Sequence, residues 1–199
     1  MTAIRQMSLY DIPSIVKIHL NAFTGFFLTS MGALFLKEFY SSILFDETHI
    51  AFVFTEKEMI SGFVIGTTRP AGLYARTLIR FWYRFTWRLI QLALKNPAII
   101  LRLLKRTTQA FGANYISDEA LLMSLAVLPE YEGQGVGRGL VNAFISEAHS
   151  RGIKKIFLTT DRNENIRANQ FYQNMNFKIV RSFITNEERE MNEYCLEIT

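Results

Sequence analysis

The 199-residue sequence has a single cysteine, Cys195, so no disulfide can form within the chain. This favours a reducing compartment, with Cys195 as a buried strand residue. Prolines are also few, at four, while 49% of the residues are hydrophobic. This composition excludes disordered, collagen-like and low-complexity chains. It predicts a folded protein with a full-sized core, and we expect one domain over residues 1–199.

Segments that direct a chain to or across a membrane are lacking as well. No run reaches about 18 uncharged apolar residues, which argues against an ordinary transmembrane helix. The opening residues, MTAIRQMSLYD, show neither an apolar core nor a small-residue cleavage site. We therefore expect no signal peptide and a cytoplasmic location.

Acidic residues are missing from residues 69–117, which hold nine lysines and arginines. The remainder has thirteen basic and eighteen acidic residues, so the net charge of +4 belongs to this segment. Within it, 15 of the 22 residues 73–94 are apolar, and arginines recur every fourth position from Arg76 to Arg88. We expect a basic helical insertion over about 70–117, as two helices divided near Pro97.

The apolar surface of this insertion must be covered by the domain itself, by a second subunit in a homodimer or by lipid. The sequence leaves all three open. Trp82 and Trp87 beside the arginines fit an interfacial helix at anionic lipid, placing the protein peripherally at the inner membrane surface. They fit equally a site for a phosphorylated or lipid-linked sugar. The expected contact region is 73–106.

Hydrophobic periodicity outside the insertion alternates between strand and helix patterns. Strands are predicted at 2–7, 50–55, 59–67, 120–127, 155–160, 178–183 and 192–198, and helices at 11–23, 32–43, 136–151 and 166–174. Residues 25–29 between the first two helices receive no regular structure. Strands interleaved with helices indicate a mixed sheet of the α/β or α+β class.

A glycine-dense turn between a strand and a helix is the sharpest local feature. Its alternating glycines are Gly133, Gly135, Gly137 and Gly139. Glycine permits close approach and unusual torsions, so successive amides can face one anion beside the positive end of the following helix. A tight turn with no ligand is an equally open interpretation of the glycines alone.

Two motifs together make the sequence resemble the GNAT superfamily of acyl-CoA-dependent N-acyltransferases. Residues 132–137, EGQGVG, resemble the family's Gln/Arg-x-x-Gly-x-Gly/Ala signature after a strand, with Glu132 departing from its first position. A second pattern is matched downstream, with Asn176 in place of a family glycine, by Asn165, Ala168, Phe171, Tyr172 and Phe177. Asparagine tolerates left-handed torsions, so the replacement is mild.

The resemblance implies a central twisted, mostly antiparallel sheet flanked by helices, with the insertion between the third and fourth strands. It implies transfer of an acetyl group from acetyl-CoA to a primary amine held between two splayed strands. The residues that would bind the cofactor are Leu125, Ala126, Val127, Glu132, Gly133, Gln134, Gly135, Val136, Gly137, Arg138, Gly139, Asn165 and Tyr172. A solvated helix arginine is an equal alternative for Arg138.

Tyr172 takes the family's general-acid position, where it would protonate the departing thiolate. The alternative is a packed aromatic with an exposed hydroxyl. The general base is undecided, because the position where many relatives carry a glutamate is Leu121. Asp118, Glu119 and Ser124 do not match by position, and a water chain is the other option.

The resemblance places a small-molecule amine acceptor against the connection between the first two helices. The expected substrate residues are Phe26, Phe27, Leu28 and Ser124, with core packing as the alternative for the aromatics. An amino sugar is our acceptor hypothesis. His19, His49 and His149 lack metal-ligand spacing, so no metal is expected.

Two other classes compete with an enzyme. A nucleic-acid-binding module would explain the arginines, but the insertion is mostly apolar and the rest of the chain is acidic. We therefore expect no nucleic-acid partner. A catalytically weak acyl-CoA sensor, or a membrane-docked interaction protein on the same scaffold, would explain the glycine turn and the missing glutamate.

Overall fold

A computed structural model describes residues 2–70, 118–163, 165–185 and 188–198. The basic insertion expected at 70–117 lies outside the described residues except for residue 70. The expected lipid or sugar contact region at 73–106 lies outside them entirely. Both sequence motifs lie within the described ranges.

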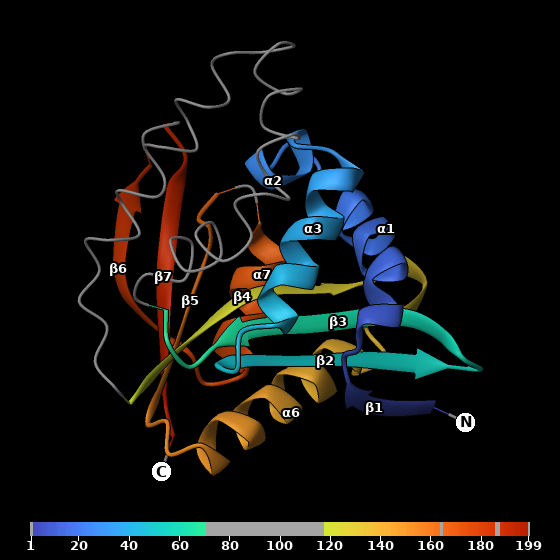
Figure 1. Cartoon of the computed structure of the whole chain (residues 1–199). Coiled ribbons are helices and arrows are strands. Elements are labelled where there is room, and N and C mark those ends of the chain that lie inside the picture. The colour runs from blue at the N-terminus through green and yellow to red at the C-terminus, as the bar shows by residue number, and fades with distance from the viewer. Residues whose placement is uncertain (1, 71–117, 164, 186–187, 199) are drawn as a thin grey trace.

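The described strands form one seven-stranded sheet in the order β1-β2-β3-β4-β5-β7-β6 (Figure 1). Their bounds are β1 Thr2–Gln6, β2 His49–Glu56, β3 Met59–Thr67, β4 Glu119–Val127, β5 Lys155–Asp161, β6 Lys178–Ile184 and β7 Glu190–Glu197. Every neighbouring pair is antiparallel except β4 and β5, which are parallel. The predicted mixed, mostly antiparallel sheet is thus confirmed, and Cys195 is buried in β7 as expected.

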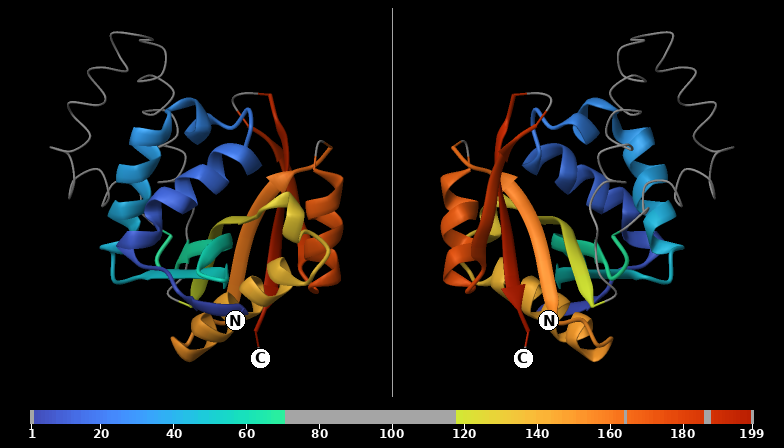
Figure 2. Two further views of the ribbon diagram at one scale, coloured as in Figure 1. Left: turned by 90° about the vertical axis from the view of Figure 1, so that its right-hand side faces the viewer. Right: turned by 90° about the vertical axis from the view of Figure 1, so that its left-hand side faces the viewer.

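Helices cover both faces of the sheet (Figure 2). One face carries α1 Ile12–Ala22, α2 Phe27–Ser30 and α3 Ala33–Leu44, and the other carries α6 Val136–Ser150 and α7 Ile166–Asn174. Each face has its own hydrophobic core. The first centres on residues such as Ile15, Leu36 and Phe63, and the second on Leu140, Phe144 and Ile156.

The four helices predicted outside the insertion are confirmed to within one or two residues, and the structure adds one more in the connection after α1. No element was predicted for residues 25–29, and Phe27–Ser30 form the single helical turn α2. Gly25 at φ 81° redirects the chain, and the Phe26 carbonyl then accepts a hydrogen bond from the Ser30 amide at 3.1 Å. A four-residue helix is too short to show a periodic pattern in a sequence.

A β-bulge in β4 bends the centre of the sheet. The β3 residues Ile65 and Gly66 are consecutive, yet they pair with Ser124 and Leu122, so Met123 has no partner. An extra residue in one strand bends it and increases its twist. A Cβ on Gly66 would lie 2.2 Å from the Leu121 carbonyl oxygen, so only glycine fits opposite the bend.

Among the described residues, no helix has the length and apolar character that crossing a membrane requires.

Candidate functional site

The parallel strands β4 and β5 separate where the bulge begins. Their pairing comprises three residue pairs and ends at Leu121 with Phe157. β4 continues to Val127 with β3 still at its other edge, while β5 continues to Asp161 with β7 at its other edge. The sheet therefore opens between residues 122–127 of β4 and 158–161 of β5. The splayed strands expected from the family resemblance are present.

The predicted cofactor residues Leu125, Ala126 and Val127 line one side of this opening. They pair with Val64, Phe63 and Gly62 of β3, whereas no β5 residue pairs with them. Their main chain therefore offers hydrogen-bonding groups at an edge inside the sheet. An extended ligand with amide groups can add to such an edge as a further strand.

A cluster of amides lies at the end of β4, where the chain passes through the 3₁₀ turn Pro129–Tyr131 into α6. Within the described structure, the backbone N–H groups from Gly133 to Arg138 donate to no protein acceptor. The first intrahelical bond is donated by Gly139 to the carbonyl of Gly135, at 2.9 Å. Several free amides at the positive end of a 15-residue helix suit a phosphate or pyrophosphate.

The four alternating glycines serve two different geometries. Gly133 and Gly135 have φ of 73° and 82°, in the left-handed region that favours glycine. Gly137 and Gly139 lie inside α6, where a Cβ on Gly137 would make ordinary contacts but one on Gly139 would be too close to a neighbour. A Cβ on Gly139 would lie 2.9 Å from Ile4 of β1. Because the Gly139 amide is used within the helix, we expect its contribution to ligand binding to be steric only.

Side chains at the glycine turn leave the amides accessible. Val136 is buried, so its contribution is its backbone. Gln134 donates to the Glu130 carbonyl at 2.7 Å, and Glu132 pairs with the exposed Arg167 of α7 at 3.3 Å. Arg138 is exposed at the start of α6 and forms no ion pair with the described residues. Arg138 is thus free to contact a phosphate.

A buried polar network fixes α7 against the other side of the cleft. Asn169 donates to the Asp161 carbonyl at 2.7 Å and accepts from the Tyr194 hydroxyl at 2.7 Å and from Asn192 at 3.0 Å. Asn165, which precedes α7, donates to the Thr160 hydroxyl at 3.1 Å. This network sets the position of Asn165 and of Tyr172, one turn after Asn169.

Asn169 was not predicted as a functional residue. It occupies a variable position of the downstream motif, and the one available signal was an asparagine on the buried side of an otherwise amphipathic helix. Asn176 has φ of 64°, which confirms that this residue takes the left-handed torsion of the family glycine.

The predicted general acid Tyr172 lies in the core beside the cleft. Its side chain is buried, and its ring packs at 5.1 Å from Phe171, 5.7 Å from Phe177 and 6.0 Å from Tyr194. Burial raises the pKa of the phenol above its ordinary value of 10. The hydroxyl is therefore protonated throughout the neutral range and can donate a hydrogen bond or a proton.

The carboxylates considered as general base lie away from the opening. Glu119 is buried at the start of β4, opposite Lys155, where the two strands are still paired. Asp118 forms an ion pair with Lys154 at 3.7 Å. Ser124 is half-buried just beyond the bulge, inside the open part of the cleft. Neither acid faces Ser124 across a strand pair, so the structure brings neither of them to the open part of the cleft.

The predicted acceptor residues lie on the opposite face of the sheet from α6. Phe26 is half-buried in the connection before α2, and its ring lies 4.2 Å from the guanidinium carbon of Arg189. Leu28 packs on the first core. Phe27 begins α2, and its side chain is outside the described part. Arg189 also forms a bidentate ion pair with Asp161 of β5, and neither residue had been predicted.

The three histidines lie in different environments. His19 is buried beside Tyr40, His49 is half-buried and His149 is exposed. Across the described ranges, no cluster of three or more His, Cys, Asp or Glu side chains has the arrangement of a metal site.

An internal sheet edge beside a row of free amides at a helix N-terminus defines a class of proteins, those of the GNAT fold. Comparison with known proteins agrees. The model of the Acetyltransferase (GNAT) family matches residues 12–177, and the chain belongs to this family.

Individual relatives are distant. The [ribosomal protein bS18]-alanine N-acetyltransferase of Escherichia coli strain K12 is 37% identical over 62 residues, which is 31% of this chain and 41% of the relative. The chain thus spans about two fifths of the length of the curated relatives it matches.

Solved structures resemble the whole described fold. The Escherichia coli ribosomal-protein-S18-alanine N-acetyltransferase has a TM-score of 0.63 at 19% identity, covering 100% of this chain and 95% of that one. The PaiA N-acetyltransferase of Thermoplasma acidophilum, solved with coenzyme A, has a TM-score of 0.61 at 14% identity, covering 97% and 98%. At such identities, the likeness concerns the fold.

Proposed function

We propose that this protein is an N-acetyltransferase that transfers an acetyl group from acetyl-CoA to a primary amine. One observation carries the proposal: the free edge of Leu125–Val127 leads directly to the row of free amides from Gly133 to Arg138. The edge suits the amide-containing pantetheine arm, and the amides suit the pyrophosphate. A strand edge and an anion site in this order match both halves of coenzyme A.

The residues present also suit the chemistry. The amine nitrogen attacks the thioester carbon, the C–S bond breaks, and an amide and a thiolate result. The Tyr172 phenol is protonated at neutral pH and donates its hydrogen to the departing sulfur, and water returns a proton to the phenol. The proton lost by the amine leaves through water, because Glu119 and Asp118 both lie at the paired end of β4 and β5 and not in the open part of the cleft.

Two acceptor classes are supported by different observations. The curated relatives acetylate an alanine of a ribosomal protein, which supports the α-amine of a peptide. The aromatic Phe26 at the acceptor face supports our hypothesis of a small amine such as an amino sugar, on which a ring can stack.

Release of free thiol from acetyl-CoA tests the proposal. The acceptors are glucosamine, a nucleotide amino sugar, spermidine and a hexapeptide that begins with alanine, each with wild type and Tyr172→Phe. We expect one class to give turnover that the variant loses. Tight coenzyme A binding without turnover on any acceptor would contradict the enzyme proposal and favour the acyl-CoA sensor.

A further inference from the structure

A three-residue bridge spans the opening of the sheet on the face that carries α1–α3. The Arg189 guanidinium lies over the Phe26 ring at 4.2 Å, and it forms a bidentate ion pair with Asp161, in which Nε lies 2.9 Å from Oδ1. Phe26 belongs to the connection between α1 and α2. Asp161 ends β5, and Arg189 directly precedes β7. The bridge therefore joins a helical connection to the β5–β7 half of the sheet.

The side chain of Asp161 points away from the amide cluster. Ile156 and Leu158 of β5 belong to the core beneath α6 and α7, and Thr160 contacts Asn165 on that same side. Strand residues alternate between faces, so Asp161 faces the α1–α3 side. The amides of the glycine turn and the Phe26–Arg189–Asp161 bridge thus lie on opposite faces of the opening.

This arrangement distinguishes two entrances. A coenzyme that lies along β4 with its pyrophosphate on α6 occupies the α6–α7 side. A second reactant must then approach the same opening from the α1–α3 side, where α1 packs against β3 and β4. The bridge lies at the far end of this entrance. Asp161 is four residues further along β5 than Phe157, the last residue that pairs with β4, which corresponds to about 13 Å along the strand.

We propose that Arg189 is a positioning residue for the acceptor amine: by joining Phe26 to Asp161, it holds the α1–α2 connection as the far wall of the acceptor entrance. This inference rests on the proposed acetyltransferase function. Arginine suits the task because its planar guanidinium can stack on a ring while both of its edges donate to a carboxylate. Lysine, a point charge, cannot do both.

The charge on the bridge is balanced. The Asp161 carboxylate is buried and the Arg189 side chain is mostly so, with side-chain exposures of 8% and 25%. Removing the guanidinium alone would leave a buried carboxylate without its partner. The test therefore uses Arg189→Met together with Asp161→Asn, which removes both charges and keeps the volume close to the original. Phe26→Leu is a second variant, since it leaves the ion pair intact and removes only the ring.

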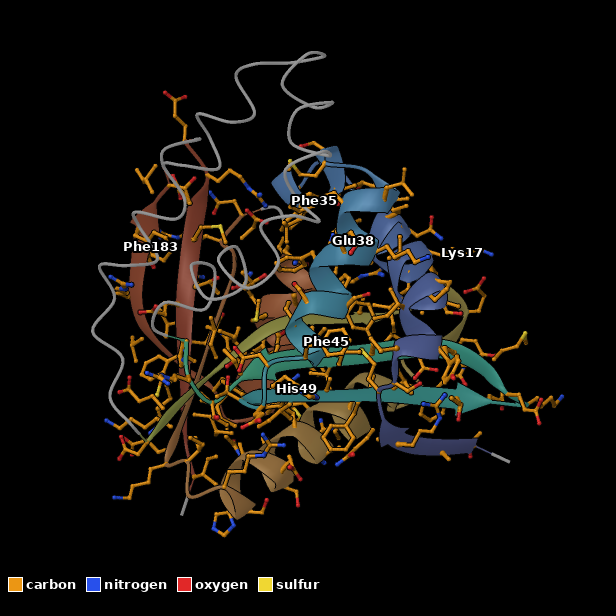
Figure 3. All side chains as sticks on the ribbon, in the orientation of Figure 1. Lys17, Phe35, Glu38, Phe45, His49 and Phe183 are labelled. Carbon is orange, nitrogen blue, oxygen red and sulfur yellow. The ribbon has the colours of Figure 1, made fainter. Side chains whose placement is uncertain are left out.

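Arg181 provides a matched control on the neighbouring hairpin. It forms a bidentate ion pair with Glu193 at 2.6 and 3.1 Å, and its guanidinium lies 5.1 Å from the Phe183 ring. Phe183 lies on β6 at the sheet edge, away from α1 and α3, where Lys17 and Phe35 are labelled (Figure 3). Arg181→Met thus removes the same kind of interaction from a place that the acceptor does not approach.

The experiment measures kcat and KM for glucosamine, spermidine and the alanine hexapeptide, and KM for acetyl-CoA, in each purified variant. For every amine that wild type acetylates, we expect Phe26→Leu and the Asp161→Asn/Arg189→Met pair to raise acceptor KM on the order of ten- to a hundredfold. KM for acetyl-CoA should stay within about twofold, as should both constants in Arg181→Met. An Arg189→Lys variant should fall between wild type and the double variant.

The outcomes separate this inference from the proposed function. Absence of turnover by wild type with every amine would remove the acetyltransferase proposal itself. Turnover by wild type with unchanged acceptor KM in Phe26→Leu and in the double variant would overturn only the role of Arg189. An equal rise in both KM values, or the same rise in Arg181→Met, would also overturn it, because it would indicate a general loss of structure.

Discussion

The Tyr172 hydroxyl is buried among aromatic rings, and this environment sets its expected behaviour in catalysis. A raised pKa keeps the phenol protonated below pH 10, so Tyr172 should contribute no ionisation to the pH profile between pH 6 and 9. Tyr172→Phe should lower kcat on the order of a hundredfold, the lower range for a general acid, with coenzyme A affinity unchanged. Steady-state kinetics and calorimetric titration with coenzyme A measure the two quantities.

Tyr194 is the control for this substitution, because it is a buried tyrosine of the same core. Its hydroxyl donates to Asn169, so Tyr194→Phe should cost about 1 kcal/mol of folding stability and leave kcat within a few-fold of wild type. Equal losses of kcat in the two variants would assign the Tyr172 effect to packing.

A second residue-scale prediction concerns His19, whose side chain is 3% exposed. Its Nδ1 lies 2.7 Å from the Tyr40 hydroxyl, and its Nε2 is buried without a hydrogen-bond partner among the described residues. Burial lowers the pKa of His19 from 6.5 to about 4. Between these values the unfolded chain binds the proton and the folded protein does not.

Folding stability should therefore be complete above pH 6.5 and decline as the pH falls towards 4, by up to about 3 kcal/mol from this residue. His19→Gln should remove that part of the decline. Urea unfolding of both proteins at pH 7.5, 6, 5 and 4 measures the difference. Parallel stability curves would show that His19 titrates alike in the folded and unfolded states.

Residues that act through the backbone or within a motif were predictable, whereas those that act through distant contacts were not. The glycines of the turn, Asn165 and Tyr172 stand at fixed spacings along one stretch of chain. Arg189 meets Asp161 and Phe26 only because three separate elements converge on the α1–α3 face. In the sequence, Arg189 stands in a polar turn, and no pattern there indicates that it contacts Asp161 and Phe26.

At the scale of elements, Gly66 of β3 sets how closely α6 and β4 can approach. A Cβ there would lie 2.2 Å from the Leu121 carbonyl oxygen and 2.7 Å from the Phe144 ring. Because the carbonyl belongs to a central strand, it cannot move aside easily. Gly66→Ala should destabilise the fold by about 1–3 kcal/mol or more.

Gly137→Ala is the comparison for Gly66→Ala, since its Cβ would meet the Phe171 ring at an ordinary 3.6 Å. Alanine is also the better helix former, so the stability of this variant should equal or exceed that of wild type by up to about 1 kcal/mol. Chemical unfolding checks both. Similar stability of the two variants would contradict the close approach at Gly66.

The elements themselves were largely predictable, since alternation and helical periodicity located the strands and long helices. Two features escaped prediction. The helix α2 is a single turn without periodicity, and the bulge at Met123 lies in a run of apolar residues, LLMSLAV, that shows no alternation. A strand buried on both faces does not reveal from its sequence where its pairing slips.

At the scale of the whole molecule, the family resemblance predicted a mostly antiparallel sheet, whereas the order of the strands was not predicted. Periodicity indicates that strands exist, but it does not indicate that β7 lies between β5 and β6. The parting of β4 from β5 was likewise expected only through the resemblance. It is nevertheless the feature on which the proposed function rests.

Ligand binding at this opening should stabilise the whole protein. A coenzyme that binds only the folded state adds about 2.7 kcal/mol when its concentration is 100 times the dissociation constant. Thermal unfolding with increasing coenzyme A should show a steady rise in Tm. Gly135→Ala, which forces a left-handed torsion on alanine, should show a smaller rise than wild type at equal concentrations. No rise in wild type would contradict binding at the glycine turn.

The three residue pairs between β4 and β5 form the narrowest join in the sheet, and most of what connects the two halves is the core beneath α6. The molecule is therefore a candidate for stepwise opening, in which β5–β7 part from β1–β4 before either half unfolds. Amide hydrogen exchange would reveal this as two sets of protection factors that divide at the join. A coenzyme lying along β4 would act as an eighth strand and merge the two sets into one cooperative unit.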